Sequence, residues 1–87
     1  MIDTFNINSA ITMTDDDFVE VANQGEAGPT IYVVEVGTDG WAIYGPAGVY
    51  ENPAGDRIFT NLAGAHSLIS GWGIKRFVQG KVVLVLP

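Results

Sequence analysis

The chain has 87 residues, of which 47% are hydrophobic and 16% are charged, and its net charge is -6. A chain of this length forms a single domain with a small core. The negative charge argues against nucleic acid as the main partner, because phosphate contacts require clustered lysine and arginine side chains. The sequence contains no cysteine, which excludes a disulfide framework and a thiolate metal site.

Charged residues are scarcer here than in a typical globular domain, where they make up about 25% of the chain. Part of the surface is therefore expected to be apolar and to contact a partner. Neither a signal peptide nor a membrane span is expected. Met1-Ile2-Asp3 lacks a basic n-region, and the longest uncharged stretch, 58–74, contains Asn61 and His66.

Charge is distributed unevenly along the chain. Eight of the ten acidic residues lie between Asp3 and Asp39, ahead of the first basic residue, Arg57. Three of the four basic residues, Lys75, Arg76 and Lys81, lie close together near the C-terminus. This polarity suits head-to-tail contacts, or contacts that close the fold between the two ends of the chain.

Residues 1–9 are predicted to form a short strand or an extended arm, because Phe5 and Ile7 alternate with polar residues. Such an arm is poorly held by its own domain, so it is expected to pack on a neighbouring molecule. The remainder, residues 10–87, is predicted to be a single β domain that begins with a β-prone run over 10–14.

Two interpretations compete for the segment that follows Thr14. The three aspartates at 15–17 could start a helix, with Phe18 and Val21 at helical spacing. Alternatively they form a turn, and 18–23 continues as a strand paired with 10–14. The apolar stripe is only about two turns long, and valines prefer strands, so the strand is favoured.

The clearest local signal is a hairpin over Thr30–Tyr44. Two runs of β-branched and aromatic residues flank Gly37-Thr38-Asp39-Gly40, and Asp-Gly between such runs is a strong signal for a tight turn. Side chains alternate along a strand. Ile31, Val33 and Glu35 are therefore expected on one face, and Tyr32, Val34 and Val36 on the other.

The second half of the chain is predicted from turn signals. Residues 45–56 contain two Pro-Ala-Gly turns and form a long loop, which is a candidate contact region. A short strand is expected at 57–59. Residues 61–70 fit either a short helix or a strand near 67–70. Two strands, 74–78 and 81–86, form a second hairpin around Gln79-Gly80.

These segments predict an all-β fold, a small antiparallel β-sandwich or barrel of about seven or eight short strands. The alternative is an α+β fold with one helix near 61–70. No internal repeat and no linker divides the chain.

From Ala10 onward the order of features resembles small β-sandwich proteins of tailed-phage virions, of the head decoration or cement type. The similar features are the threonine-rich run Ile11-Thr12-Met13-Thr14, then Phe18-Val19-Glu20-Val21, then a loop into Thr30-Ile31-Tyr32-Val33, a Leu62-Ala63-Gly64 corner and a terminal strand pair across Gly80. The resemblance implies a structural role on a virus particle, without catalysis. It contains no motif that transfers individual site residues.

No catalytic or cofactor-binding residues and no metal site are predicted. Three consecutive aspartates at 15–17 point in different directions, whereas a calcium loop alternates its ligands with other residues. His66 and Ser67 are adjacent, so their side chains do not face each other, and no nucleophile elbow surrounds the serine. Gly71 and Gly73 lack the lysine of a phosphate-binding loop.

The hypothesis that follows is a non-enzymatic phage structural protein, a capsid decoration subunit acting through contacts with the major capsid protein or with its own copies as a homo-oligomer. It would reside in the virion, and in the host cytoplasm before assembly, without nucleic acid, membrane or cofactor. Aromatic side chains beside glycine turns often anchor interfaces. The candidate interface residues, which include two such aromatics, are Phe5, Ile7, Tyr50, Trp72, Lys75 and Arg76.

Two other functions are alternative hypotheses. The first is a small phage-encoded inhibitor that binds a host defence protein, and the second is a carbohydrate-binding module that uses Trp72 and Tyr50. Recovery of the protein in purified particles would separate the structural subunit from the inhibitor.

Overall fold

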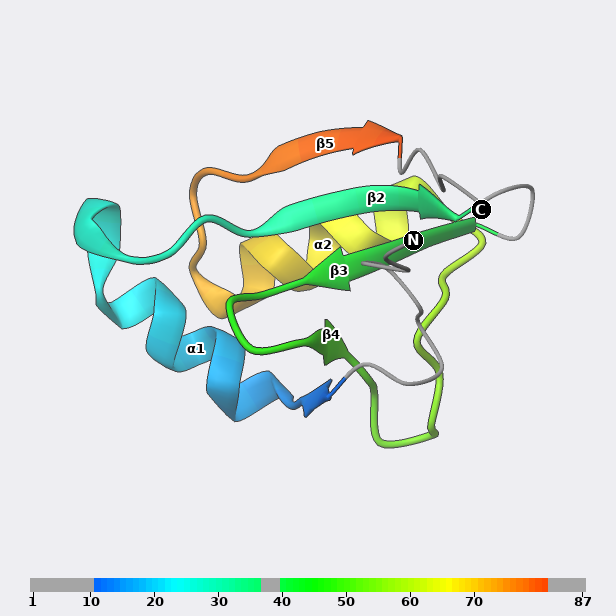
Figure 1. Cartoon of the computed structure of the whole chain (residues 1–87), viewed down its shortest axis with the longest axis horizontal. Coiled ribbons are helices and arrows are strands. Elements are labelled where there is room, and N and C mark those ends of the chain that lie inside the picture. The colour runs from blue at the N-terminus through cyan, green and yellow to red at the C-terminus, as the bar shows by residue number, and fades with distance from the viewer. Residues whose placement is uncertain (1–10, 37–39, 82–87) are drawn as a thin grey trace, which may run out of the picture.

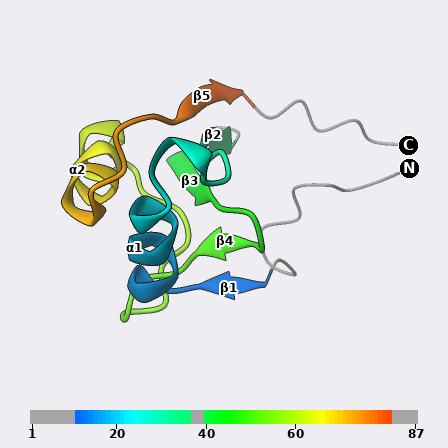
Figure 2. The same ribbon diagram turned by 90° about the vertical axis from the view of Figure 1, so that its left-hand side faces the viewer.

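The computed structural model describes residues 11–36 and 40–81 and shows one open, mixed five-stranded sheet with two α-helices. The strand order is β1-β4-β3-β2-β5. Figure 2 shows both helices on the same side of the sheet. In chain order the elements are β1 (Thr12–Met13), α1 (Asp15–Asn23), a 3-10 turn (Gly25–Ala27), β2 (Tyr32–Val36), β3 (Gly40–Tyr44), β4 (Val49–Tyr50), α2 (Leu62–Trp72) and β5 (Val78–Lys81).

The prediction of an all-β sandwich or barrel is wrong, because the fold is α+β with an open sheet. The alternative, an α+β fold with one helix near 61–70, comes closer, but α2 is the second of two helices. The predicted arm over 1–9 lies outside the described residues. The sheet is mixed, since β1 runs parallel to β4 and β2 runs parallel to β5, while β3 is antiparallel to both its neighbours.

The segment from Asp15 to Asn23 is a helix, so the favoured strand over 18–23 is wrong. As a strand it would have placed Glu20 on the same face as Phe18. As a helix it buries Phe18 and Val21 and leaves Glu20 exposed. The carboxylate of Asp17 accepts hydrogen bonds from the backbone N–H and the hydroxyl of Thr14, at 2.8 and 3.2 Å, which closes the first turn.

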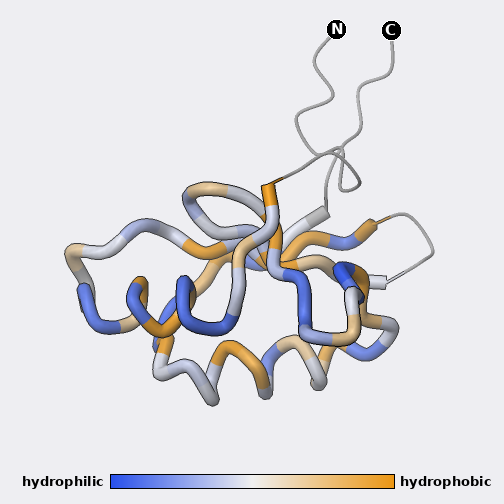
Figure 3. Tube along the Cα trace, turned by 90° about the horizontal axis from the view of Figure 1, so that it is seen from below, coloured by the Kyte–Doolittle hydropathy of each residue, from blue (hydrophilic) through white to orange (hydrophobic). Residues whose placement is uncertain are grey.

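The helix α2 begins at Asn61, whose side-chain oxygen accepts a hydrogen bond of 2.9 Å from the Ala63 N–H. It ends at Gly73, which adopts a left-handed conformation with φ of 90°. The predicted strand near 67–70 is therefore absent. Figure 3 shows how the two helices differ in composition, since α1 is mainly hydrophilic and α2 is mainly neutral to hydrophobic.

The central hairpin is confirmed. Val33 pairs with Ile43 and Val34 with Ala42 in the antiparallel register of β2 and β3. Val33 and Ile43 pack with the helices in the main core, and Val34 and Ala42 form a second cluster with Tyr44 and Val49. Side chains alternate between the faces of a sheet, so this second cluster lies on the face turned away from the helices.

The second predicted hairpin is not formed around Gln79-Gly80. β5 runs straight through these two residues and pairs in parallel with β2, with Val78 opposite Tyr32 and Gly80 opposite Val34. Figure 1 shows β5 at the edge of the sheet, beside β2. The predicted strand at 57–59 is reduced to a single bridge between Phe59 and Trp41.

Candidate functional site

The structure separates the six candidate interface residues. Phe5 and Ile7 lie outside the described residues. Tyr50 and Trp72 are buried in the core, with 1% and 8% of their surface exposed. Lys75 and Arg76 are exposed and adjacent, in the segment that links α2 to β5. Of the four candidates in the described part of the chain, only the two basic residues therefore lie on a surface that a partner can reach.

Tyr50 and Trp72 belong to an aromatic cluster organised around Asp15. The ring of Trp72 stacks on Phe18 with centroids 4.5 Å apart, and it meets the ring of Tyr50 edge-on at 4.8 Å. Oδ1 of Asp15 accepts hydrogen bonds from the Tyr50 hydroxyl at 3.0 Å and from Nε1 of Trp72 at 2.8 Å. Asp15 therefore joins the first residue of α1 to β4 and to the end of α2.

Burial, and then the hydrogen bond and negative charge of Asp15, raise the pKa of Tyr50 to about 12. The phenol therefore stays protonated and keeps donating to Asp15 at neutral pH. Asp15 therefore has a structural role. Its two hydrogen bonds explain why its carboxylate points inward while Asp16 and Asp17 are exposed.

We expect Asp15→Ala to lower the free energy of unfolding by about 1–3 kcal/mol, because it leaves the buried hydroxyl and indole donors without an acceptor. Asp15→Asn should cost less, because its side-chain oxygen can still accept from both. Urea unfolding of the two variants tests this. Equal effects of the two substitutions would contradict the assigned pair of hydrogen bonds.

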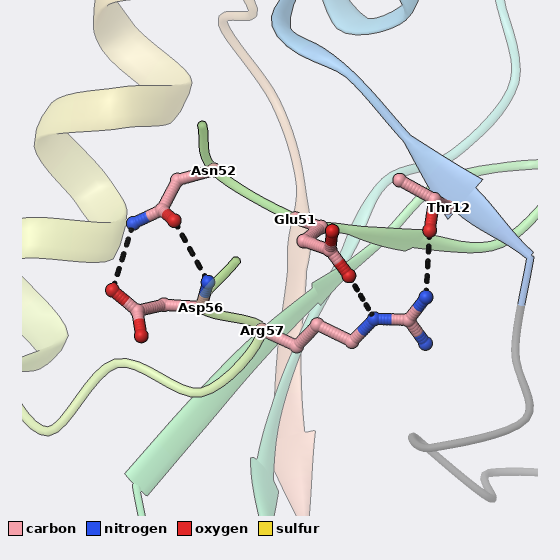
Figure 4. A network of polar contacts seen from close by, with 5 residues as sticks. All are labelled: Thr12, Glu51, Asn52, Asp56 and Arg57. Carbon is pink, nitrogen blue, oxygen red and sulfur yellow. Dashed lines mark hydrogen bonds and ion pairs between the residues drawn. The ribbon is translucent and has the colours of Figure 1, made fainter. Parts of the chain in front are cut away.

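The predicted contact loop at 45–56 is partly held by its own polar network (Figure 4). Nε of Arg57 donates to Oε1 of Glu51 at 2.7 Å, and Nη2 of Arg57 donates to the Thr12 hydroxyl at 2.6 Å. Asn52 accepts a hydrogen bond from the backbone N–H of Asp56 at 2.8 Å. The Arg57 side chain thus connects the loop to β1 through hydrogen bonds, and its role is structural.

A surface at the edge of β5 has the composition of a binding site. We call it the β5-edge surface and define it by Tyr32, Lys75, Arg76 and Val78. Tyr32 and Val78 are register partners in neighbouring strands, and 44% and 51% of their surfaces are exposed. Large apolar side chains this exposed are few among the described residues: Ile11, Val19, Tyr32 and Val78.

Neighbouring contacts fix which way the β5-edge surface faces. Phe77 packs against the ring of His66 on α2 with centroids 5.0 Å apart, and Oε1 of Gln79 lies 2.9 Å from Nε2 of His66. Side chains alternate along extended backbone. Val78, between these two residues, therefore points to the face away from the helices.

A hollow of about 770 Å³ adjoins this surface, lined by Thr30, Lys75, Arg76 and Val78 together with residues at the end of α1. A second hollow of about 510 Å³ is lined by the same 73–77 segment, including Lys75, and by His66 and Ser70 of α2. In the part of the chain described, Lys75 and Arg76 form no ion pair. The edge therefore offers an apolar strip and two free cations on a protein that is otherwise acidic.

The backbone of β5 adds to this surface. The N–H of Val78 donates to the Ile31 carbonyl at 2.9 Å. Because backbone groups alternate in direction along a strand, those of Gln79 point away from β2. An edge with unpaired backbone groups can accept another extended segment. Tyr32 and Val78 were not predicted from the sequence, because the alternation in β2 does not show which face the helices cover.

The described residues contain no group of three histidine, aspartate or glutamate side chains placed to hold a metal ion. Neither helix in this part of the chain is long and apolar enough to cross a membrane. Comparison with family models, curated protein sequences and solved structures finds no match for this chain. The β5-edge surface is therefore the feature on which a function can be argued.

Proposed function

We propose that this protein is a non-catalytic structural subunit that acts through protein–protein contacts at the β5-edge surface. The observation that supports this proposal is the exposure of Tyr32 and Val78 beside Lys75 and Arg76. Tyrosine and arginine are enriched at the energetic centres of protein interfaces, and an aliphatic side chain next to them supplies apolar area that water leaves on binding.

The form of structural subunit that we propose is one that decorates and stabilises a virus capsid. The low charged fraction of 16% and the exposed apolar side chains Tyr32 and Val78 suit a chain whose surface is covered by other subunits of an assembly. The resemblance to head-decoration proteins supports this form less, because the predicted strand at 18–23 is a helix and no sandwich is formed.

The experiment is to count copies of the protein in purified virus particles from the source culture and to compare a surface variant with a matched control. Tyr32→Asp with Val78→Asp should remove the protein from particles, because it places two charges in the apolar strip. Ser67→Asp with Ser70→Asp, at exposed positions of α2, should leave its copy number unchanged.

Absence of the wild-type chain from particles, with capture of one soluble host protein through the same surface, would replace the structural subunit by the inhibitor. Circular dichroism of each variant establishes that the domain is folded before binding is scored.

A further inference from the structure

We infer that the β5-edge surface binds the outer face of α1 of a second copy of the chain, so that copies associate head to tail. This inference rests on the proposed function and names the partner of the same surface. The outer face of α1 is defined here by Asp16, Val19 and Glu20.

The outer face of α1 complements the β5-edge surface in charge. Asp16 and Glu20 are one turn apart on the helix, about 6 Å along its axis, and both are exposed. In the described part of the chain neither forms an ion pair. Two adjacent cations on one surface and two neighbouring carboxylates on the other therefore remain available to pair between molecules.

The two surfaces also match in apolar content. Val19 lies on the same part of the helix as the two carboxylates and is 40% exposed, as Tyr32 and Val78 are exposed beside the two cations. The four large apolar side chains exposed in the described residues thus form two pairs, one in each of two parts of the protein. Ile11 and Val19 lie in the acidic half of the chain, and Tyr32 and Val78 lie beside the basic segment.

The apolar parts of the two surfaces lie on opposite sides of the sheet within one molecule. Helix α1 lies on one side of the sheet (Figure 2). Tyr32 and Val78 are on the opposite face, because Tyr32 alternates with the core residue Val33 and Val78 is its register partner. Contact between them therefore requires two copies. Because the two patches differ, the contact is heterologous, and its repetition produces a ring or an open chain of subunits.

A symmetric pairing of two β5 edges is less favourable. It would bring Lys75 and Arg76 of one copy toward the same residues of the other, and like charges in an interface oppose association. The head-to-tail contact instead pairs each cationic segment with carboxylates. Charge steering then sets the orientation, and the apolar side chains supply the buried area.

The test uses two charge-reversal variants of the full chain. The first, Lys75→Glu with Arg76→Glu, alters the β5-edge surface. The second, Asp16→Lys with Glu20→Lys, alters the outer face of α1. Each variant alone should sediment at the monomer mass of 9.3 kDa, whereas the mass of the wild type should rise with concentration past that of a dimer. We expect each variant to weaken self-association about tenfold or more.

Mixing the two variants gives the decisive result. Each retains one intact surface, and the two altered surfaces carry opposite charges, so an equimolar mixture should regain association with the two variants in alternating order. The wild-type assembly should weaken in about 1 M salt, where the screening length falls to about 3 Å. Ala63→Lys with Ser67→Lys and Ala63→Glu with Ser67→Glu, at exposed α2 positions with the spacing of Asp16 and Glu20, are the charge controls and should assemble normally.

A wild-type protein that stays monomeric at every concentration would overturn the inference, as would a mixture of the two variants that stays monomeric. Self-association that persists in the second variant but not in the first would overturn it too, in favour of symmetric pairing of β5. Binding to particles by a monomeric wild type would overturn the inference alone. Self-association without any particle binding would overturn the proposed capsid role alone.

Discussion

Replacing Trp72 with alanine should lower the free energy of unfolding by about 3–5 kcal/mol, the usual cost of removing a large buried aromatic side chain. The ring is 8% exposed, stacks on Phe18 and meets Tyr50 edge-on. Its loss also removes the Nε1 donor from Asp15. Small domains are stable by about 5–15 kcal/mol, so this single change removes a large part of the total.

The measurement is urea unfolding followed by circular dichroism, with Tyr32→Ala as the matched control. Tyr32 is also aromatic, but 44% of its surface is exposed, so its truncation should cost about 1 kcal/mol or less. If Trp72→Ala does not fold, Trp72→Phe provides the readout. It keeps an aromatic ring against Phe18 and removes the indole donor, with an expected cost of about 1–3 kcal/mol. Similar costs for Trp72→Ala and Tyr32→Ala would contradict the packing described here.

The position of Trp72 also shows what local sequence signals could and could not predict. The glycines on either side of Trp72 led to its prediction as an interface anchor, whereas the side chain is buried. The helical spacing that begins with Leu62, Ala65 and Ile69 continues to Trp72, and the true end of the helix is Gly73. The pattern contained this information, but the predicted helix over 61–70 ends before Gly71 and leaves Trp72 outside. A glycine ends a helix only where the chain adopts the left-handed conformation.

The central hairpin was predictable because it is local. The alternation in 31–36 and the turn residues after it determine the pairing of β2 with β3. The helix α1 was less predictable, because the strand preference of Val19 and Val21 opposes it. Tertiary contacts decided the outcome, since Phe18, Val21 and Asp15 all reach the aromatic cluster only from a helix.

The edge position of β5 could not be derived from sequence. Gln79-Gly80 has turn composition, but Gly80 lies opposite Val34 in a parallel ladder with a strand more than forty residues earlier in the chain. A short window of sequence contains no signal for such long-range pairing. The β5-edge surface depends on this pairing, because Tyr32 and Val78 become neighbours only in the folded sheet.

Replacing Gly40 with alanine should lower the free energy of unfolding by about 3 kcal/mol or more. The sequence predicted a cost at this residue from the requirements of a tight turn, and residues 37–39 of that turn lie outside the described residues. The structure gives a further reason. Gly40 has φ of 141°, a region that other residues enter at a cost of about 1–3 kcal/mol. A Cβ atom would also press against the Phe59 carbonyl group.

The Phe59 carbonyl cannot move freely, because it accepts a hydrogen bond of 2.8 Å from Trp41, and the Phe59 N–H donates to the Trp41 carbonyl at 2.8 Å. Gly64→Ala is the matched control. Gly64 is exposed within α2 with nothing near its Cβ position, so alanine there should stabilise the domain by about 0.5–1 kcal/mol. Opposite signs are therefore expected for one chemical change at two sites.

Urea unfolding gives the two free energies, and amide hydrogen exchange at Trp41 and Phe59 locates the damage in Gly40→Ala. Both amides should exchange faster in that variant, because the bridge that ties 57–59 to β3 must open to admit the methyl group. A Gly40→Ala protein of wild-type stability with slow exchange at both amides would show that the segment 57–59 does not approach β3 this closely.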